Sequence, residues 1–326
     1  MARMELCLIG SGFTEVRSLA RAVQNSLPWS PMDFVRGVSV EGDRAVQAAS
    51  LLRDIDPADD LRFVYPIGVH GELAVCAERL PWDSDFFGYG VARLHGLFPL
   101  GSDGYCADAD YAPAVDMLIT AAKSRGIRYL FAVVDSRDLP TNRALTARGF
   151  SLLETRLYYH RPVRNYAYPR RFRCRLATSA DLPCLLEVAR SVENPFDRFN
   201  ADPFIAKADV VRLMETWIRA SLLKGFADAA MIPDMRSPGA VITMKYHRDK
   251  AADWNMSIAQ LVLAMAAPRA GNGFLNVLSE IVYHLKELGV DHVACSTQIT
   301  NRSAIRAGEH LGFKVGKSEY VFRLLL

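Results

Sequence analysis

The densest group of residues that could do chemistry lies near the middle of the chain, between Tyr158 and Arg175. These 18 residues contain six arginines, four tyrosines and no acidic residue. Guanidinium groups bind phosphates through paired hydrogen bonds, and aromatic rings stack on bases. The stretch therefore suits a nucleotide-linked sugar, the 3′-phosphate of coenzyme A or an RNA, with Arg170 and Arg171 as candidate contacts. A solvated linker between two domains is an equally good interpretation.

Two other chemical signals are weaker. Six cysteines are spread along the chain without a C-x-x-C pair, which predicts reduced, mostly buried thiols and no zinc site. Gly10-Ser11-Gly12 follows an apolar run and precedes a helical pattern, an arrangement that can hold a nucleotide phosphate. The third glycine of that motif is missing, so a plain strand, turn and helix is favoured.

Length and composition limit the class of protein. The chain has 326 residues, of which 50% are hydrophobic and 23% charged. At roughly 100–200 residues per domain, this predicts two globular domains and excludes wholesale disorder or a fibrous repeat. No apolar run approaches the ~20 residues that span a bilayer, and the start does not resemble a signal peptide. We therefore expect a cytoplasmic protein without a membrane partner, while a net charge of +3 identifies no partner.

The periodicity of the apolar residues predicts alternating strands and helices in two successive stretches. In the first stretch we expect strands at 72–77, 90–97, 129–134 and 151–159, and helices at 112–125 and 142–148. In the second we expect strands at 173–176, 240–246, 255–264, 292–297 and 314–325, and helices at 179–190, 208–224, 274–288 and 301–311.

The two stretches end in the same way. In each, an asparagine (Asn142 or Asn301) opens a short helix that leads to Gly-Phe (149–150 or 312–313) and a long strand. A repeat at roughly 160 residues suggests the duplication of one domain. We therefore divide the chain into an α/β extension of unknown role (1–65), a shortened copy (66–165) and a complete copy (166–326).

The second stretch ends in Asn301-x-x-Ala304, Leu311-Gly312-Phe313 and Tyr320-Val321-Phe322, and its order of elements resembles the GNAT superfamily of acyl-CoA N-acyltransferases. The block Leu80–Gly88 is similar to the W-[DE]-x-x-F-F-G segment of TDP-fucosamine acetyltransferase and related sugar-biosynthesis enzymes. Those enzymes also join a truncated GNAT domain to a complete one. The resemblance covers about residues 70–326. It implies an α/β fold of tandem GNAT domains, a truncated N-terminal copy plus a complete C-terminal copy, with mixed, mostly antiparallel sheets and flanking helices.

In that superfamily acyl-CoA enters a cleft between two central strands that splay apart. By resemblance, the strand at 260–265 pairs with the pantetheine arm, and the turn at 268–275 holds the pyrophosphate at a helix start, where free N–H groups favour an anion. The implied coenzyme contacts are Leu263, Ala264, Met265, Arg269, Gly271, Asn272, Gly273, Phe274 and Asn301. The family loop [QR]-x-x-G-x-[GA] is only partly matched, because Ala270 and Leu275 occupy its first and last positions. A turn that needs glycine for its dihedral angles, and an asparagine that caps its own helix, are the alternatives.

Many GNAT enzymes protonate the leaving thiolate with a tyrosine seven residues after the asparagine, and this position is Gly308. The acid could instead be Tyr320, Tyr283, Ser303 or water, and the base His247, Asp253 or Glu193. Among these, Tyr320, Ser303 and His247 are our catalytic candidates. The candidate acceptor contacts are Trp82, Asp83, Phe86, Arg170 and Arg171. For the block that contains Trp82, an aromatic core cluster with Phe86 and Phe87 is the alternative.

The resemblance implies an N-acyltransferase that moves an acyl group, expected to be acetyl, from acyl-CoA to a primary amine. The expected acceptor is a nucleotide-linked amino sugar or another biosynthetic intermediate, with acyl-CoA as co-substrate, no metal, and a homodimer as a compatible assembly. One alternative is an aminoacyl-tRNA-dependent transferase on a Fem-like tandem GNAT scaffold, with tRNA as the partner. The other is a non-catalytic binding protein with a GNAT fold.

Overall fold

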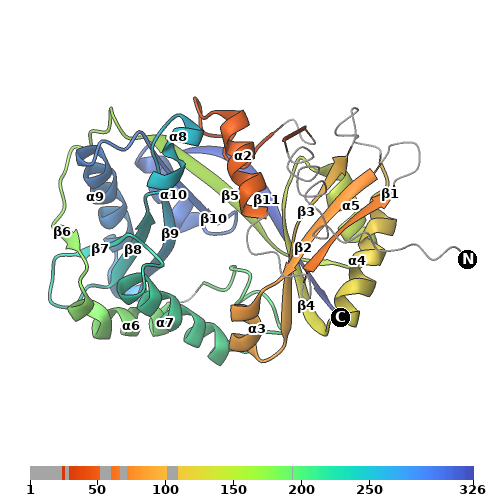
Figure 1. Ribbon diagram of the computed structural model, residues 1–326. Coiled ribbons are helices and arrows are strands. Elements are labelled where there is room, and N and C mark those ends of the chain that lie inside the picture. The colour runs from red at the N-terminus through yellow and green to blue at the C-terminus, as the bar shows by residue number, and fades with distance from the viewer. Residues whose placement is uncertain (1–23, 26–28, 52–59, 67–71, 101–108, 193) are drawn as a thin grey trace, which may run out of the picture. The chain divides into compact units, whose positions relative to one another are not determined.

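The computed structural model describes residues 24–25, 29–51, 60–66, 72–100, 109–192 and 194–326 (Figure 1). The chain forms two compact units. Of the described residues, unit 1 comprises those within 24–33, 38–155 and 318–326, and unit 2 comprises those within 34–37 and 156–317. The Gly10-Ser11-Gly12 turn lies outside the described residues. None of the helices in the described ranges has the length and apolar character needed to cross a bilayer.

Unit 1 is a sheet with helices packed on it, in the strand order β1-β2-β3-β4-β11. Its strands are β1 (Asp60–Pro66), β2 (Glu72–Arg79), β3 (Gly90–Leu100), β4 (Ile127–Asp135) and the last part of β11 (Lys314–Leu325). Its helices are α2 (Val40–Leu51), α3 (Pro81–Phe87), α4 (Ala112–Ser124) and α5 (Leu139–Ala147). Only β3 and β4 run parallel. The apolar side of α4, with Val115 and Leu118, packs on Leu130 and its neighbours in one core.

Unit 2 has the strand order β5-β10-β9-β8-β7-β6 and is covered on both faces. Its strands are β5 (Ser151–Pro162), β6 (Cys174–Leu176), β7 (Ala229–Pro233), β8 (Ala240–Lys245), β9 (Ile258–Ala266) and β10 (His292–Gln298). Its helices are α6 (Leu182–Ser191), α7 (Lys207–Leu223), α8 (Ala251–Trp254), α9 (Gly273–Glu287) and α10 (Arg302–His310). Helices α9 and α10 pack on one face of this sheet, and α6 and α7 pack on the other (Figure 1).

The same series of elements occurs twice along the chain. The series β1-β2-α3-β3-α4-β4-α5-β5 is followed later by β7-β8-α8-β9-α9-β10-α10-β11. In the second copy β6, α6 and α7 precede the series, whereas ahead of β1 the described residues show α2 and the helical residues 24–25. The relative length of the two copies remains a prediction.

The last strand of each copy belongs to the sheet of the other. Strand β5 follows α5 in the first copy, but its residues from Arg156 to Pro162 pair with β10 in unit 2. Strand β11 follows α10 in the second copy, but its residues from Glu319 to Leu325 pair with β4 in unit 1. The chain thus passes from one unit to the other within β5 and again within β11. The predicted division at residues 65 and 165 remains a prediction about the copies.

The structure corrects the predicted start of the short helix in the first copy. Asn142 does not open a helix; α5 begins at Leu139, and its N-cap is Asp138, which accepts a hydrogen bond from the Thr141 N–H at 3.3 Å. Asp138 stands eleven residues before Gly149, as Asn301 stands eleven before Gly312. The two copies therefore align without a gap, because Asp and Asn cap helices in the same way.

Asp138 is a buried cap, and its burial raises the pKa of the carboxyl to about 6, against the opposing effect of the Thr141 hydrogen bonds. The Asp138 carboxyl therefore binds a proton more tightly in the folded state than in the unfolded state. Its protonated form contributes to the free energy of unfolding fully below about pH 4, and this contribution is lost as the pH rises through about 6. We expect Asp138→Asn to raise the free energy of unfolding by about 1–2 kcal/mol at pH 8 and by much less at pH 4.

Urea denaturation at both pH values measures this difference. The matched control is Asn301→Asp at the equivalent cap of α10, which is half-buried and should show a smaller dependence on pH. An Asp138→Asn variant whose stability follows pH as the wild type does would contradict the prediction.

Candidate functional site

Strands β9 and β10 of unit 2 separate along their length. They pair in parallel only from Ile258 to Gln260 and from His292 to Ala294. Beyond this point β9 continues to Ala266 on the side of β8, and β10 continues to Gln298 on the side of β5. Beyond this point the facing N–H and C=O groups of the two strands do not pair with each other, so they can bind a ligand that carries peptide groups.

Strand β9 also changes register where it leaves β10. Leu261 pairs with Met244 and Leu263 with Thr243, so the intervening Val262 forms a bulge. The Leu263 N–H donates to the Thr243 hydroxyl at 3.1 Å. Bulges of this kind redirect side chains and often border functional sites.

The predicted pantetheine strand lies in this separating part of β9. Met265 is buried against α6 and α7, Leu263 is half-buried beside it, and Ala264 is exposed. Their contact with a coenzyme stays a prediction.

A glycine turn joins β9 to α9 and leaves the start of the helix open. Gly271 has φ 54° and ψ −124°, a conformation that essentially only glycine adopts. Asn272 is the N-cap of α9 but makes no side-chain capping bond, and the first intrahelical bond runs from the Asn276 N–H to the Asn272 carbonyl at 3.0 Å. The N–H groups of Gly273 and Phe274 precede it and are donors suited to an anion.

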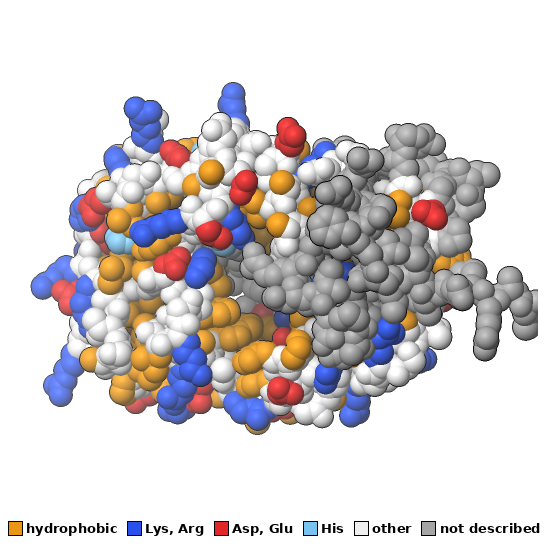
Figure 2. Space-filling view, viewed as in Figure 1, with side chains coloured by type: hydrophobic (Ala, Val, Ile, Leu, Met, Phe, Trp, Pro, Cys, Tyr) orange, Lys and Arg blue, Asp and Glu red, His pale blue; other side chains and the backbone are white. Residues whose placement is uncertain are grey.

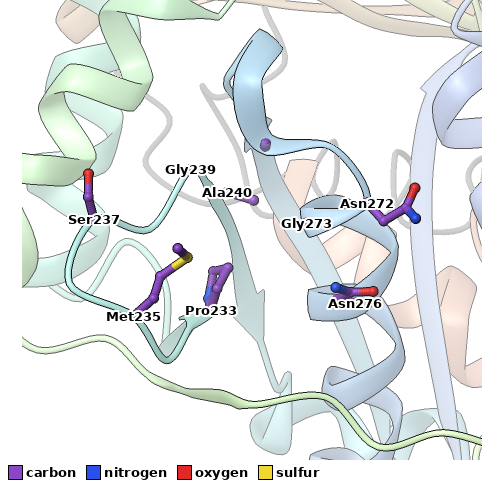
Figure 3. Close-up of a pocket in the computed structure, with 9 residues that line it drawn as sticks. Pro233, Met235, Ser237, Gly239, Ala240, Asn272, Gly273 and Asn276 are labelled. Atoms are coloured by element: carbon purple, nitrogen blue, oxygen red, sulfur yellow. The ribbon is translucent and has the colours of Figure 1, made fainter.

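A cavity of about 360 Å³ opens beside this helix start (Figure 3). It is lined by Pro233, Met235, Ser237, Gly239, Ala240, Ala270, Asn272, Gly273 and Asn276. Asn276 faces Pro233 and Met235 across it in Figure 3. A Cβ on Gly239 would lie 3.3 Å from the Ala270 Cβ, so small residues let the turn approach β8. The lining side chains carry no charge, and the side chain of Arg269 lies outside the described part of the chain.

His247 lies at the narrow end of the β9–β10 separation. Its Nε2 is 2.9 Å from the Gln260 side-chain oxygen, and its ring lies edge-to-face with Trp254 at 5.5 Å. Gln260 is the last β9 residue paired with β10, and it points away from α9 because its neighbours Ala259 and Leu261 pack under that helix. The His247 backbone has φ 46°, an uncommon strained conformation for a residue other than glycine.

Burial lowers the pKa of His247 below its usual value, against the opposing effect of the Gln260 hydrogen bond. The imidazole is therefore neutral at neutral pH. With Nε2–H donating to Gln260, Nδ1 carries the lone pair that can accept a proton. Cys295 on β10 is a poor nucleophile, because burial raises the pKa of its thiol to about 12 and keeps it protonated at neutral pH.

The other two catalytic candidates lie elsewhere. Tyr320 belongs to the part of β11 in unit 1, where it packs against the core beside Phe322. Ser303 belongs to unit 2 and is exposed in the first turn of α10. The Asn301 side chain accepts a hydrogen bond from the Ala304 N–H at 3.2 Å, so its capping role is confirmed.

Gly308, where many GNAT enzymes carry tyrosine, is buried, and a Cβ there would make an ordinary contact 3.7 Å from Phe313. Its neighbour His310 bonds to the Tyr168 hydroxyl at 2.8 Å. Glycine has no side chain that could act as the general acid, and the His310 ring is directed to Tyr168.

The Trp82 block forms helix α3 in unit 1. The Trp82 ring is 48% exposed and stacks on Phe86 at 5.2 Å, and Phe86 meets Phe87 edge-on at 4.9 Å. Asp83 is half-buried. The three rings therefore cluster, but the cluster is not the buried core one that was predicted, because Trp82 is exposed and Phe86 and Phe87 are only half-buried.

Three of the six arginines in the basic stretch, Arg171, Arg173 and Arg175, have carboxylate partners within unit 2. Arg171 binds the buried Glu280 at 2.8 Å and lies 4.1 Å from the ring of Tyr283. Arg175 makes two bonds to Asp181 at 2.7 and 2.8 Å. Arg170 stacks on Phe172 and is exposed. The charge pattern of the stretch could not reveal these acidic partners, because they lie outside it in the sequence.

Three polar residues of the site were not predicted from the sequence: Asn194 and Ser237 lie in loops, and Asn276 lies in the first turn of α9. Asn194 donates to the Gln298 side-chain oxygen at 3.1 Å, at the far end of β10, and Ser237 and Asn276 border the cavity. No residue pattern in the sequence marks them. Among the described residues, no three His, Cys, Asp or Glu side chains are placed to hold a metal ion.

No family model matches the chain, and no curated protein matches it. Solved structures do. A GCN5-related N-acetyltransferase from Sphaerobacter thermophilus matches with a TM-score of 0.59 and 10% identity, over 96% of this chain and 93% of that one. A tandem GNAT protein from the clavulanic acid biosynthesis pathway matches with a TM-score of 0.52 and 14% identity, over 95% and 93%. A GCN5-related N-acetyltransferase from Kribbella flavida matches with a TM-score of 0.50 and 12% identity, over 85% of this chain and 92% of that one. The chain therefore has the tandem GNAT fold, with a truncated N-terminal copy and a complete C-terminal copy.

Proposed function

We propose that this chain is an N-acyltransferase that moves an acyl group, most simply acetyl, from acyl-CoA to a primary amine of a small molecule. The observation that carries the proposal is the separation of β9 from β10 next to the open start of α9. A pantetheine arm carries two amide groups that can pair with a strand edge, and a pyrophosphate suits a helix start. Acetyl-CoA is the co-substrate in this proposal.

The chemistry balances without a metal or a covalent enzyme intermediate. The amine nitrogen attacks the thioester carbonyl, the C–N bond forms and the C–S bond breaks. One amine proton passes to a base, for which His247 has the right protonation state. The thiolate leaves readily because thiol pKa values lie near 8.5, so a group at the Gly308 position is not essential. Backbone N–H groups on the open edge of β9 are suited to stabilise the oxyanion.

The acceptor class is an extension of this proposal. We propose a nucleotide-linked amino sugar as the acceptor. Within unit 1 the exposed Trp82, stacked on Phe86, is the kind of aromatic surface on which the rings of sugars and bases pack. The tRNA-dependent alternative needs a free basic surface. The carboxylate partners of Arg171 and Arg175 argue against such a surface, because they neutralise these two charges. On the face in view, Lys and Arg side chains are also interspersed with acidic and apolar ones (Figure 2).

The proposal is tested by the affinity of the glycine turn for acetyl-CoA. We expect Gly271→Ala to weaken binding by about tenfold or more, because alanine cannot hold the turn that directs the N–H donors. Isothermal titration with acetyl-CoA measures the effect.

Gly225→Ala is the matched control, since both glycines have positive φ (54° and 69°) and neither has an atom within 4 Å of an added Cβ. It should lose similar stability and keep its affinity. Absence of binding to the wild type at millimolar acetyl-CoA, or equal affinities of the two variants, would remove the proposal.

A further inference from the structure

The segment Phe34–Gly37 is the one part of the chain before Arg156 that groups with unit 2. The ring of Phe34 lies 5.8 Å from the ring of Tyr158 and 5.9 Å from that of His160. A Cβ on Gly316 would lie 2.4 Å from Phe34, so the ring fills the space that this glycine leaves above β11. The segment is therefore built into unit 2 by specific packing.

The segment lies on the face of the sheet opposite α9. Tyr158 and His160 alternate along β5 with Tyr159, which packs in the core under α9. Gln260 and its partner His247 lie on the same face as Tyr158. Because His247 is the proposed base and lies on this face, an amine that gives it a proton must approach from the same face.

The two rings already bind a primary ammonium group. The Nζ of Lys317 lies 4.6 Å from the ring centre of Tyr158 and 5.7 Å from that of Phe34. Cation–π attraction at such distances is strongest where the rings are shielded from water. Beside them His160 adds no charge at neutral pH, because burial, with the nearby His292 and Lys314, lowers its pKa. An acceptor amine in water carries the same charged group as Lys317.

We propose that Phe34 and Tyr158 form the site that recognises the ammonium group of the acceptor, and that Lys317 occupies this site in the absence of acceptor. The inference rests on the proposed function and specifies its acceptor side. The acceptor displaces the Lys317 side chain and binds against the two rings as an ammonium group. One proton must then pass from it to water or a base before the nitrogen can attack the thioester. Phe34, supplied from outside the two repeated series, is thus a specificity-determining residue of this chain.

The test is the binding of benzylamine, followed by saturation-transfer NMR and titration, to the full chain. We expect Phe34→Leu to weaken binding by about fivefold, since leucine keeps the packing but loses the ring face. We expect Lys317→Gln to tighten binding by a similar factor, because it removes the internal competitor. The controls are Phe226→Leu and Lys207→Gln, exposed residues of unit 2 that should leave binding unchanged.

Acetyl-CoA titration of the same variants separates the two proposals. Unchanged acetyl-CoA affinity together with opposite shifts for benzylamine supports the inference. The inference is overturned if the wild type does not bind benzylamine, if both variants bind it like the wild type, or if Lys317→Gln weakens it. If the wild type does not bind acetyl-CoA, the proposed function is removed. The changes in benzylamine affinity between the variants still test the ammonium site in that case.

Discussion

A fragment that carries only the second copy, residues 166–326, is expected to lack cooperative unfolding and to aggregate. Strand β5 pairs with all of β10 from His292 to Gln298, and it lies before the start of this fragment. Tyr159 and Val163 are also removed from the core beneath α9. The fragment therefore leaves the edge of β10 unpaired and a cavity in the core, the two features that most promote aggregation and unfolding.

Adding back residues 151–165 should restore a folded unit 2. Thermal unfolding followed by circular dichroism, with size-exclusion chromatography, compares fragments 166–326 and 151–326. A shorter fragment that is monomeric and melts cooperatively at the temperature of the longer one would show that β5 is dispensable. The reverse experiment removes Ser318–Leu326 from the full chain, which deprives β4 of its partner and unit 1 of Phe322.

Periodicity predicted the elements with strong apolar patterns and missed those set by context. Helix α9 and strand β4 lie within one or two residues of their predicted bounds, because long amphipathic or apolar runs define them. Strand β7 was missed, since Ala229–Pro233 is short, contains two alanines and ends in proline. The exchange of β5 and β11 could not be predicted, because a buried pattern shows that a strand is covered and not which strand pairs with it.

The site divides along the same line. The turn before α9 was predicted since glycines before a helix have a local meaning, and the structure places Gly271 there with a positive φ. The environment of His247 was not predictable, because its partner Gln260 and its backbone strain arise from the way β8 returns to β9. Arg171 was misleading for a similar reason, as its partner Glu280 is buried on a distant helix.

We expect His247→Gln to lower kcat for acetyl transfer by about 10²–10⁴-fold while leaving the KM for acetyl-CoA unchanged. His247 lies on the face opposite α9, beside the last paired residue of β9, and its neutral ring can accept the amine proton. Glutamine keeps a hydrogen-bonding side chain but accepts no proton at neutral pH. The matched control is His284→Gln, because His284 also bonds to a neighbour, Tyr246, and its pKa is also lowered by burial.

The dependence of rate on pH distinguishes a base from a structural histidine. Burial lowers the pKa of His247 below 6.5, so the active, unprotonated form predominates at neutral pH and kcat should fall only as the pH drops through that lowered value. The residual activity of His247→Gln should lose this acidic limb, whereas His284→Gln should keep it. If the role of His247 were purely structural, the His247→Gln variant would lose stability and kcat together. Its pH profile would keep the acidic limb, because another group would be the base and would still titrate. A pH profile of kcat for the three proteins therefore decides the role that a single activity measurement would leave open.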